Sequence, residues 1–175
     1  YDTVICECAQ GIGLDKRRES MYPHVTASDT TSEISMVLLA VLKGRLARHM
    51  DIEICYITRA YLTRHGVGPL ENECNKEDIN PAIEDQTNVP NEYQGTIRYG
   101  EFDIEQFKWR IMYDRRNAWL HRNINTVSSV FVTHLNYTDG EMTGNCTLKE
   151  IFDLFKKGYK SYTKYAEDVI EVIKK

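Results

Sequence analysis

The 175-residue sequence has neither an excess of positive charge nor a long apolar run, and each absence excludes a class of protein. Its 22 lysines and arginines stand against 26 aspartates and glutamates, which gives a formal net charge of −4. A chain with this balance lacks the basic surface that neutralises nucleic-acid phosphates. The longest apolar run, 36–42, is much shorter than the ~20 residues that span a bilayer, and we expect it to form a buried helix face. We therefore expect no nucleic-acid partner and no membrane span.

Cysteine is sparse and does not occur at the spacing of a metal site. The five cysteines are Cys6, Cys8, Cys55, Cys74 and Cys146. No second cysteine or histidine pair completes a zinc set, and we interpret the five as reduced thiols of a cytoplasmic protein. The chain begins with Tyr1 and carries no signal-peptide pattern, so we expect it to be a piece of a longer protein.

Apolar periodicity predicts strands that alternate with helices. We expect strands near 3–7, 52–58 and 127–132, and helices over 33–49, 103–121, 147–157 and 161–174. Glycine and proline interrupt 63–102 without clear periodicity, which is typical of a long functional loop. This order predicts an α/β fold, with a largely parallel sheet flanked by helices. Ligands of such folds bind beyond the carboxyl ends of the strands, where the unusual loops of this sequence begin.

Three segments in these loops carry chemistry. Gln10 and Gly11 follow the first expected strand, where an amide can face a ligand and a glycine allows the backbone to approach it. Segment 26–31 places four serine and threonine hydroxyls just before an expected helix start. Such a segment suits a phosphate, and a helix-capping cluster explains it equally well. Segment 58–73 contains two glycines, a proline and an arginine directly after a strand. This composition is typical of a rigid loop that holds backbone groups against a ligand.

Taken together, the three segments resemble the adenylosuccinate synthetases. The shared motifs are Glu-x-Ala-Gln-Gly-x-x-Leu-Asp over 7–15, Tyr-Pro-x-Val-Thr-x-Ser-x-x-Thr over 22–31, and Ala-Tyr-x-Thr-Arg-x-Gly-x-Gly-Pro-x-x-x-Glu over 60–73. The resemblance is strong over 4–73 and stays in register through about residue 140. It implies the P-loop-NTPase-like fold of that family, of which residues 1–175 would be the C-terminal portion. It also implies a ligase that joins L-aspartate to C6 of a 6-oxopurine mononucleotide through a 6-phosphoryl intermediate, with a nucleoside triphosphate as phosphoryl donor.

The resemblance also implies which residues bind the purine mononucleotide. Gln10 matches a glutamine that donates to the purine oxygen and supports catalysis, because a developing oxyanion needs a donor. Thr26 matches the threonine at the 5′-phosphate. His65 and Gly66 match the loop whose backbone approaches the ribose, although valine is the commoner residue at the position of His65.

Two further subsites follow from the resemblance. Thr96 and Arg98 match the aspartate-binding loop, where only one of the family's several arginines remains and an ordinary surface arginine is the alternative. Thr133, His134 and Asn136 match the Thr-Lys-x-Asp segment that reads the base of the nucleoside triphosphate. Because a neutral amide both donates and accepts, Asn136 weakens the demand for GTP and suits ATP or dATP. This relaxation resembles the phage branch of the family, which acts on dGMP in place of IMP.

Other parts of the family pattern are absent from these 175 residues. They contain neither the Gly-Asp-Glu-Gly-Lys-Gly segment that cradles phosphate nor the catalytic histidine that follows it. We therefore expect the Mg²⁺ ligands to lie in an absent N-terminal half, and the chain to be inactive alone. The family further implies a cytoplasmic homodimer. The alternatives are a non-catalytic nucleotide-binding or scaffold protein derived from this family, and a P-loop kinase or NTPase relative, which the lack of a Gly-rich Lys-Ser/Thr loop disfavours.

Overall fold

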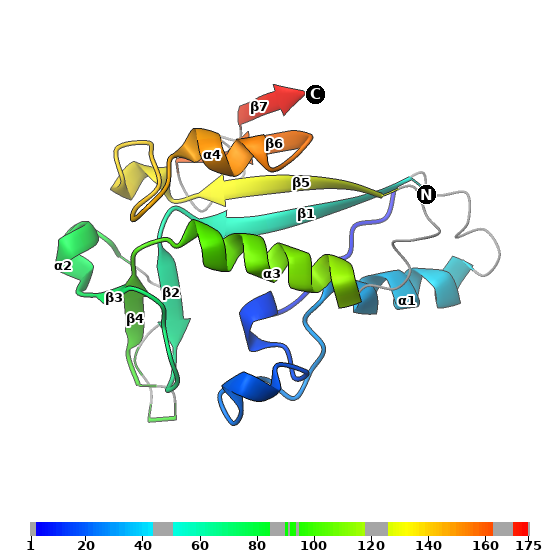
Figure 1. Cartoon of the computed structure of the whole chain (residues 1–175), viewed down its shortest axis with the longest axis horizontal. Helices are drawn as coiled ribbons and strands as arrows, with labels where there is room; N and C mark the ends of the chain where they lie inside the picture. The colour runs from blue at the N-terminus through cyan, green and yellow to red at the C-terminus, as the bar shows by residue number, and fades with distance from the viewer. Residues whose placement is uncertain are drawn as a thin grey trace. The chain divides into compact units, whose positions relative to one another are not determined.

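The computed structural model describes residues 3–43, 51–84, 90, 92–93, 95–117, 126–162 and 170–174. They fall into two units, each made of two stretches of sequence. The first unit comprises Tyr1–Ile54 and Phe107–Val127, and the second comprises Cys55–Gln106 and Ser128–Lys175. Figure 1 shows the helices and strands of both units, coloured along the chain.

A long loop and the helices that hold it make up the first unit. The loop contains two short 3-10 helices, η1 (Ile12–Leu14) and η2 (Glu19–Met21), and it leads into α1 (Ser32–Lys43). The helix α3 (Ile104–Asn117) begins in the second unit and continues into the first. Met36, Phe107 and Ile111 are buried, and this removal of apolar surface from water stabilises the unit.

The second unit contains most of a four-stranded mixed sheet. Its strand order is β1 (Ile52–Arg59), β5 (Thr126–Thr133), β6 (Lys157–Lys160) and β7 (Ile170–Lys174). β1 and β5 run in the same direction (Figure 1), β5 and β6 pair in parallel, and β7 is antiparallel to β6. The sheet is therefore mostly parallel, and the predicted α/β fold is confirmed.

A smaller antiparallel sheet follows β1 in the same unit. It consists of β2 (Leu62–His65), β4 (Ile97–Gly100) and β3 (Glu73–Cys74), with β4 in the middle. The register sets Arg64 opposite Arg98 and His65 opposite Ile97. The short helix α2 (Lys76–Ile79) follows β3. These elements occupy much of the region 63–102 that the sequence predicted to be a loop, and that prediction is wrong.

The core of the second unit lies around β5, η5 (Leu135–Tyr137) and α4 (Leu148–Asp153). Val130, Val132, Leu135 and Ile151 are completely buried. α4 begins with a capping box, in which the Thr147 hydroxyl accepts from the Glu150 N–H at 3.2 Å while the Glu150 carboxylate accepts from the Thr147 N–H at 2.8 Å. Apolar packing and a satisfied helix start thus fix the region directly after β5.

Several of the predicted elements are confirmed. The strands expected over 52–58 and 127–132 are β1 and β5, and the helices expected over 33–49 and 103–121 are α1 and α3 as far as the described residues extend. Residues 44–50 and 118–125 lie outside those residues. The helix expected over 147–157 is shorter, because it ends at Asp153.

Other expectations are wrong, and each failure has a physical reason. Residues 3–7 form no strand, and their side chains are exposed where a strand would have needed a partner. Of the helix expected over 161–174, residues 163–169 lie outside the described ranges and 170–174 form β7, whose Ile170 and Val172 favour strands because they are β-branched. The apolar run 36–42 does not form a fully buried face, since Val37, Leu38 and Val41 are all exposed.

No helix within the described ranges combines the length and the hydropathy that crossing a membrane requires.

Candidate functional site

Gln10 lies on the exposed surface of the first unit, at the start of the loop that contains η1. Its backbone φ is 67°, in the left-handed region that residues other than glycine seldom adopt. The side chain is exposed, and an N–H of this loop, that of Leu14, donates to the Gly11 carbonyl at 2.8 Å. The turn therefore presents the Gln10 amide to solvent on a backbone held by η1.

Thr26 lies on the segment that is hydrogen-bonded to the same loop. The Thr26 N–H donates to the Leu14 carbonyl at 2.8 Å, and the Lys16 N–H donates to the Ser28 carbonyl at 3.2 Å. The structure thus joins the segments of Gln10 and Thr26 within one unit. The convergence of their side chains on one ligand remains a prediction.

Two arginines, Arg18 of the loop itself and Arg110 of α3, lie beside Gly13. A Cβ atom added to Gly13 would lie 3.4 Å from Nη1 of Arg18 and 3.4 Å from Nε of Arg110. Arg18 donates to the Gly13 carbonyl at 2.7 Å and lies over the Trp109 ring, with 4.6 Å from its guanidinium carbon to the ring centroid. Two guanidinium groups therefore border the loop between Gln10 and Thr26, beside Gly13.

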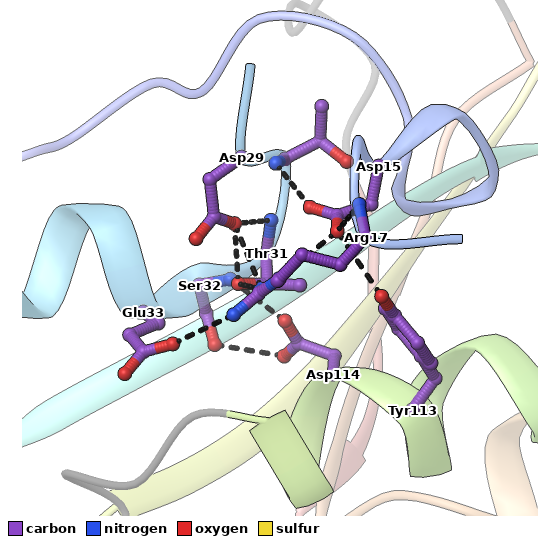
Figure 2. Close-up of polar contacts among 9 residues, drawn as sticks. Asp15, Arg17, Asp29, Thr31, Ser32, Glu33, Tyr113 and Asp114 are labelled. Carbon is purple, nitrogen blue, oxygen red and sulfur yellow. Dashed lines mark hydrogen bonds and ion pairs between the residues drawn. The ribbon is translucent and has the colours of Figure 1, made fainter. Parts of the chain in front are cut away.

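The buried carboxylate of Asp15 is hydrogen-bonded to several parts of the loop and to α3 (Figure 2). It is completely buried and accepts hydrogen bonds from the Thr30 N–H at 2.7 Å, the Arg17 N–H at 2.9 Å and the Tyr113 hydroxyl at 3.1 Å. Burial alone would raise the pKa of Asp15, but these bonds, together with the Arg17 guanidinium, lower it to about 2. Asp15 is therefore an anion at neutral pH and a fixed part of the loop.

Arg17 connects this carboxylate to the start of α1. Its Nε donates to Asp15 at 3.0 Å, its Nη2 to Asp29 at 3.0 Å and to the Thr31 hydroxyl at 2.8 Å, and its Nη1 to Glu33 at 3.1 Å. Burial would lower the pKa of Arg17, and its carboxylate partners raise it above its ordinary value. One guanidinium thus binds three carboxylates, and we name Asp15, Arg17, Asp29 and Glu33 the Arg17 network.

Asp114 of α3 attaches the start of α1 to α3. It is completely buried and accepts from the Ser32 N–H at 2.7 Å and from the Ser32 hydroxyl at 2.8 Å (Figure 2). The motifs of the sequence do not point to Arg17, Tyr113 or Asp114. A signal for Asp114 exists, because Phe107, Ile111 and Asp114 recur at helical spacing, which puts a carboxylate on an apolar face.

In the second unit, the structure brings Arg98 of β4 to the loop after β2. Arg98 Nη1 donates to the carbonyls of Gly66 at 3.1 Å and Gly68 at 2.7 Å. Arg98 Nε donates to Glu73 at 2.6 Å, and Nη2 donates to the other oxygen of the same carboxylate. Arg98, the residue predicted to bind the aspartate substrate, therefore contacts Gly66, which belongs to the loop predicted to approach the ribose.

His65 and Thr96 are the other residues predicted to bind substrate in this region. His65 directly precedes Gly66, and Thr96 lies two residues before Arg98. His65 ends β2, and its Nε2 is buried without a hydrogen-bond partner among the described residues. Thr96 is exposed and lies directly before β4, after Gly95 with a φ of 66°. No hydrogen bond of the Thr96 side chain is seen in the described part of the chain, so its role in aspartate binding stays a prediction.

The predicted base-reading residues lie at the carboxyl end of β5. The Thr133 hydroxyl donates to the Thr58 carbonyl at 3.2 Å, and the Ala60 N–H donates to the Thr133 carbonyl at 3.0 Å. These bonds join the ends of β1 and β5, where parallel sheets bind ligands. Asn136 is exposed, and its N–H donates to the Tyr162 carbonyl at 3.2 Å.

Aromatic side chains surround His134 at this strand end. Its backbone is left-handed with a φ of 63°, and its Nδ1 lies 2.9 Å from the Thr133 hydroxyl. The ring stacks with Tyr137 at 6.4 Å between centroids and meets Tyr61 edge to face at 6.1 Å. Burial raises the pKa of Tyr61 to about 12, so its hydroxyl is neutral at physiological pH. This end of the sheet therefore combines aromatic rings, of which that of Tyr61 is buried, with neutral hydrogen-bonding groups.

The described residues do not provide a metal centre. They contain no group of three or more histidine, cysteine, aspartate or glutamate side chains that could hold a metal ion. The described residues therefore form no site that fits Mg²⁺. A cavity of about 430 Å³ in the second unit, lined by α4, β6 and β7, contains none of the predicted residues.

Comparison with known proteins identifies the family. The adenylosuccinate synthetase family model matches residues 1–143. Adenylosuccinate synthetase 1 of Cupriavidus pinatubonensis is 33% identical over 144 residues, and the adenylosuccinate synthetases of Shewanella loihica and Colwellia psychrerythraea are 31% and 32% identical over 144 and 146 residues. The matches cover 78–79% of this chain but only 28–29% of each relative. No solved structure matches the chain significantly. The length of the family match and the identities shared with curated members establish that the chain belongs to the adenylosuccinate synthetase family.

Proposed function

We propose that this protein acts in purine nucleotide biosynthesis as a ligase that joins L-aspartate to C6 of a 6-oxopurine mononucleotide. O6 of the mononucleotide takes the γ-phosphoryl group of a nucleoside triphosphate. The aspartate amino group then attacks C6, the C6–O bond breaks, and phosphate leaves. The observation that carries this proposal is the family match over residues 1–143, which includes the loop that the Arg17 network holds in place.

In this proposal the first unit supplies contacts to the mononucleotide. Gln10 donates from its amide to O6, where negative charge develops as the phosphoryl group is transferred. Thr26 donates to the 5′-phosphate, and the positive charge of Arg18 and Arg110 beside the same loop favours that anion. Because the Arg17 network fixes the loop before any ligand binds, these donors need little reorganisation.

The other predicted residues are divided among the three substrates. His65 and Gly66 approach the ribose of the mononucleotide, and Thr96 and Arg98 bind the carboxylates of aspartate. Thr133, His134 and Asn136 face the base of the nucleoside triphosphate at the carboxyl end of β5. The aromatic surroundings of His134 support a planar ligand there.

Asn136 affects which nucleoside triphosphate serves as phosphoryl donor. The side chain is exposed and neutral, so it can accept from or donate to a base edge. A carboxylate at this position would accept two hydrogen bonds from the N1–H and N2–H groups of guanine, whereas an amide does not require them. We therefore include ATP or dATP beside GTP as phosphoryl donor. The resemblance to the phage branch adds dGMP beside IMP as acceptor.

The proposed reaction also requires a phosphate-binding segment and a metal ion, which the described residues do not supply. The phosphate-cradling segment and the Mg²⁺ that accompanies the triphosphate would come from an N-terminal half, because the described residues form no such metal centre. The chain alone should then bind substrates without turnover. By the same resemblance, the active protein is a cytoplasmic homodimer.

The test is aspartate-dependent release of phosphate. The chain is combined with an N-terminal half carrying the phosphate-cradling segment and supplied with GTP or ATP, IMP or dGMP, and L-aspartate. The proposal predicts phosphate release only when both the mononucleotide and aspartate are present. If the assembly binds the mononucleotide but releases no phosphate in response to aspartate, the non-catalytic nucleotide-binding alternative replaces the ligase.

A further inference from the structure

Arg98 is already occupied by a carboxylate from its own chain. A guanidinium has five N–H donors. Four of those of Arg98 point at described acceptors, two at the Glu73 carboxylate and two at the carbonyls of Gly66 and Gly68. Nε and Nη2 form an edge that binds a carboxylate with two parallel bonds, and Nη1, which would complete the other such edge, is bonded to the glycine carbonyls. Glu73 therefore holds the position that a substrate carboxylate would need.

The two edges of the same guanidinium have separate partners. Nη1 binds the glycine carbonyls at 3.1 and 2.7 Å, and neither bond involves Glu73. Arg64 reinforces the loop, since its Nε and Nη2 donate to the Val67 carbonyl at 3.2 and 3.0 Å. Three successive carbonyls are thus fixed by arginines. Glu73 can leave the Nε and Nη2 edge while Nη1 keeps the loop in place.

The pair is accessible to a competing anion. The side chain of Glu73 is 44% exposed and that of Arg98 is 28% exposed. Ion pairs at such exposure contribute little net stability, because water and salt compensate for their loss. The hydrogen bond from Arg98 lowers the pKa of the Glu73 carboxyl, so this carboxyl is an anion at neutral pH, as both carboxylates of aspartate are. The exchange therefore replaces one carboxylate with another of equal charge.

We infer that Glu73 is an internal competitor for the substrate carboxylate on Arg98 and sets the affinity of the aspartate subsite. This inference rests on the proposed function, because it takes aspartate as the ligand of Arg98. Glu73 would thereby determine specificity. Weakly binding anions would not displace its carboxylate from Nε and Nη2 of Arg98, whereas a dicarboxylate whose second carboxylate binds another residue would. If a substrate binds only when Glu73 has left Arg98, its apparent affinity equals its intrinsic affinity multiplied by the fraction of time that Nε and Nη2 are vacant.

The test follows the Nε–H resonance of Arg98 by NMR while L-aspartate is added to the 175-residue chain in the presence of IMP. Replacing Glu73→Gln keeps the size of the side chain and removes its charge. We expect half-saturation at ~3- to 10-fold lower aspartate than in the wild type. Glu73→Asp, whose shorter side chain reaches Arg98 less well, should shift half-saturation in the same direction. The matched control is Glu77→Gln in α2, where the side chain is exposed, and it should not shift half-saturation.

The outcomes separate the inference from the proposed function. If Glu73→Gln, Glu77→Gln and wild type all half-saturate at the same aspartate concentration, the inference is overturned and the aspartate subsite stands. If no variant responds to aspartate, the assignment of aspartate to Arg98 fails and the inference fails with it. The backbone amide spectrum of each variant shows whether it is folded.

Discussion

Asp114 of α3 accepts both the N–H and the hydroxyl of Ser32, the first residue of α1, at 2.7 and 2.8 Å. The two residues are 82 positions apart in the sequence. A carboxylate at a helix start satisfies an orphan N–H and is favoured by the helix dipole. This contact fixes the helix that follows the loop of Thr26, so the loop depends on a residue far away in the sequence.

Replacing Asp114→Ala should therefore destabilise the first unit. The substitution leaves two donors of Ser32 without their acceptor, and we expect the free energy of unfolding to fall by about 2 kcal/mol. Urea denaturation measures this loss, and hydrogen exchange at the start of α1 localises it. Glu77→Ala on the exposed surface should change the free energy of unfolding by less than about 0.5 kcal/mol. Equal effects of the two substitutions would show that Asp114 does not hold α1.

Asp15 should make the stability depend on pH in the acid range. Its pKa falls from an ordinary 3.8 to about 2 on folding, so its contribution is complete above the ordinary value and is lost as the pH falls through both values. The loss amounts to about 2 kcal/mol between pH 5 and pH 2. Urea unfolding at a series of pH values should show this component in the wild type and not in Asp15→Asn. Parallel pH profiles for the two proteins would contradict the assignment.

The local order of the site could be predicted from the sequence, but its supporting contacts could not. The motif around Gln10 and Thr26 predicted a loop before a helix, and α1 does begin directly after it at Ser32. The partners of that loop, Tyr113 and Asp114, lie 98 and 82 residues away along the chain from Asp15 and Ser32, which no local pattern reveals. The prediction of a long loop over 63–102 was wrong for a related reason, because β3 has only two residues and pairs with β4, which is distant in the sequence.

The proposed role of Gln10 predicts a large effect on rate. In the assembled ligase, Gln10→Ala should slow aspartate-dependent phosphate release by ~100-fold or more, because an oxyanion donor is lost from the transition state. The variant should fold normally, since the Gln10 side chain is exposed. Gln106→Ala, a glutamine outside the proposed site, serves as the control and should retain the wild-type rate. A near-normal rate for Gln10→Ala would remove this residue from the chemistry.

Asn136 should decide which nucleoside triphosphate is preferred. Asn136→Asp creates a carboxylate acceptor, and a hydrogen bond to a charged group would raise the preference for GTP over ATP by ~10- to 100-fold. The ratio of kcat/KM for the two triphosphates measures this preference. An unchanged ratio would show that the base does not contact Asn136.

The central claim is that Gln10 and Thr26 contact one bound mononucleotide, and a titration of the chain with IMP and with dGMP tests it most directly. The NMR signals of the Gln10 side-chain amide and the Thr26 backbone amide are followed together. The account predicts that both signals shift with the same half-saturation, and that Gln10→Ala and Thr26→Ala each weaken binding by ~10-fold, the loss of about one hydrogen bond. If the two signals respond to different nucleotide concentrations, or neither responds, the account is contradicted.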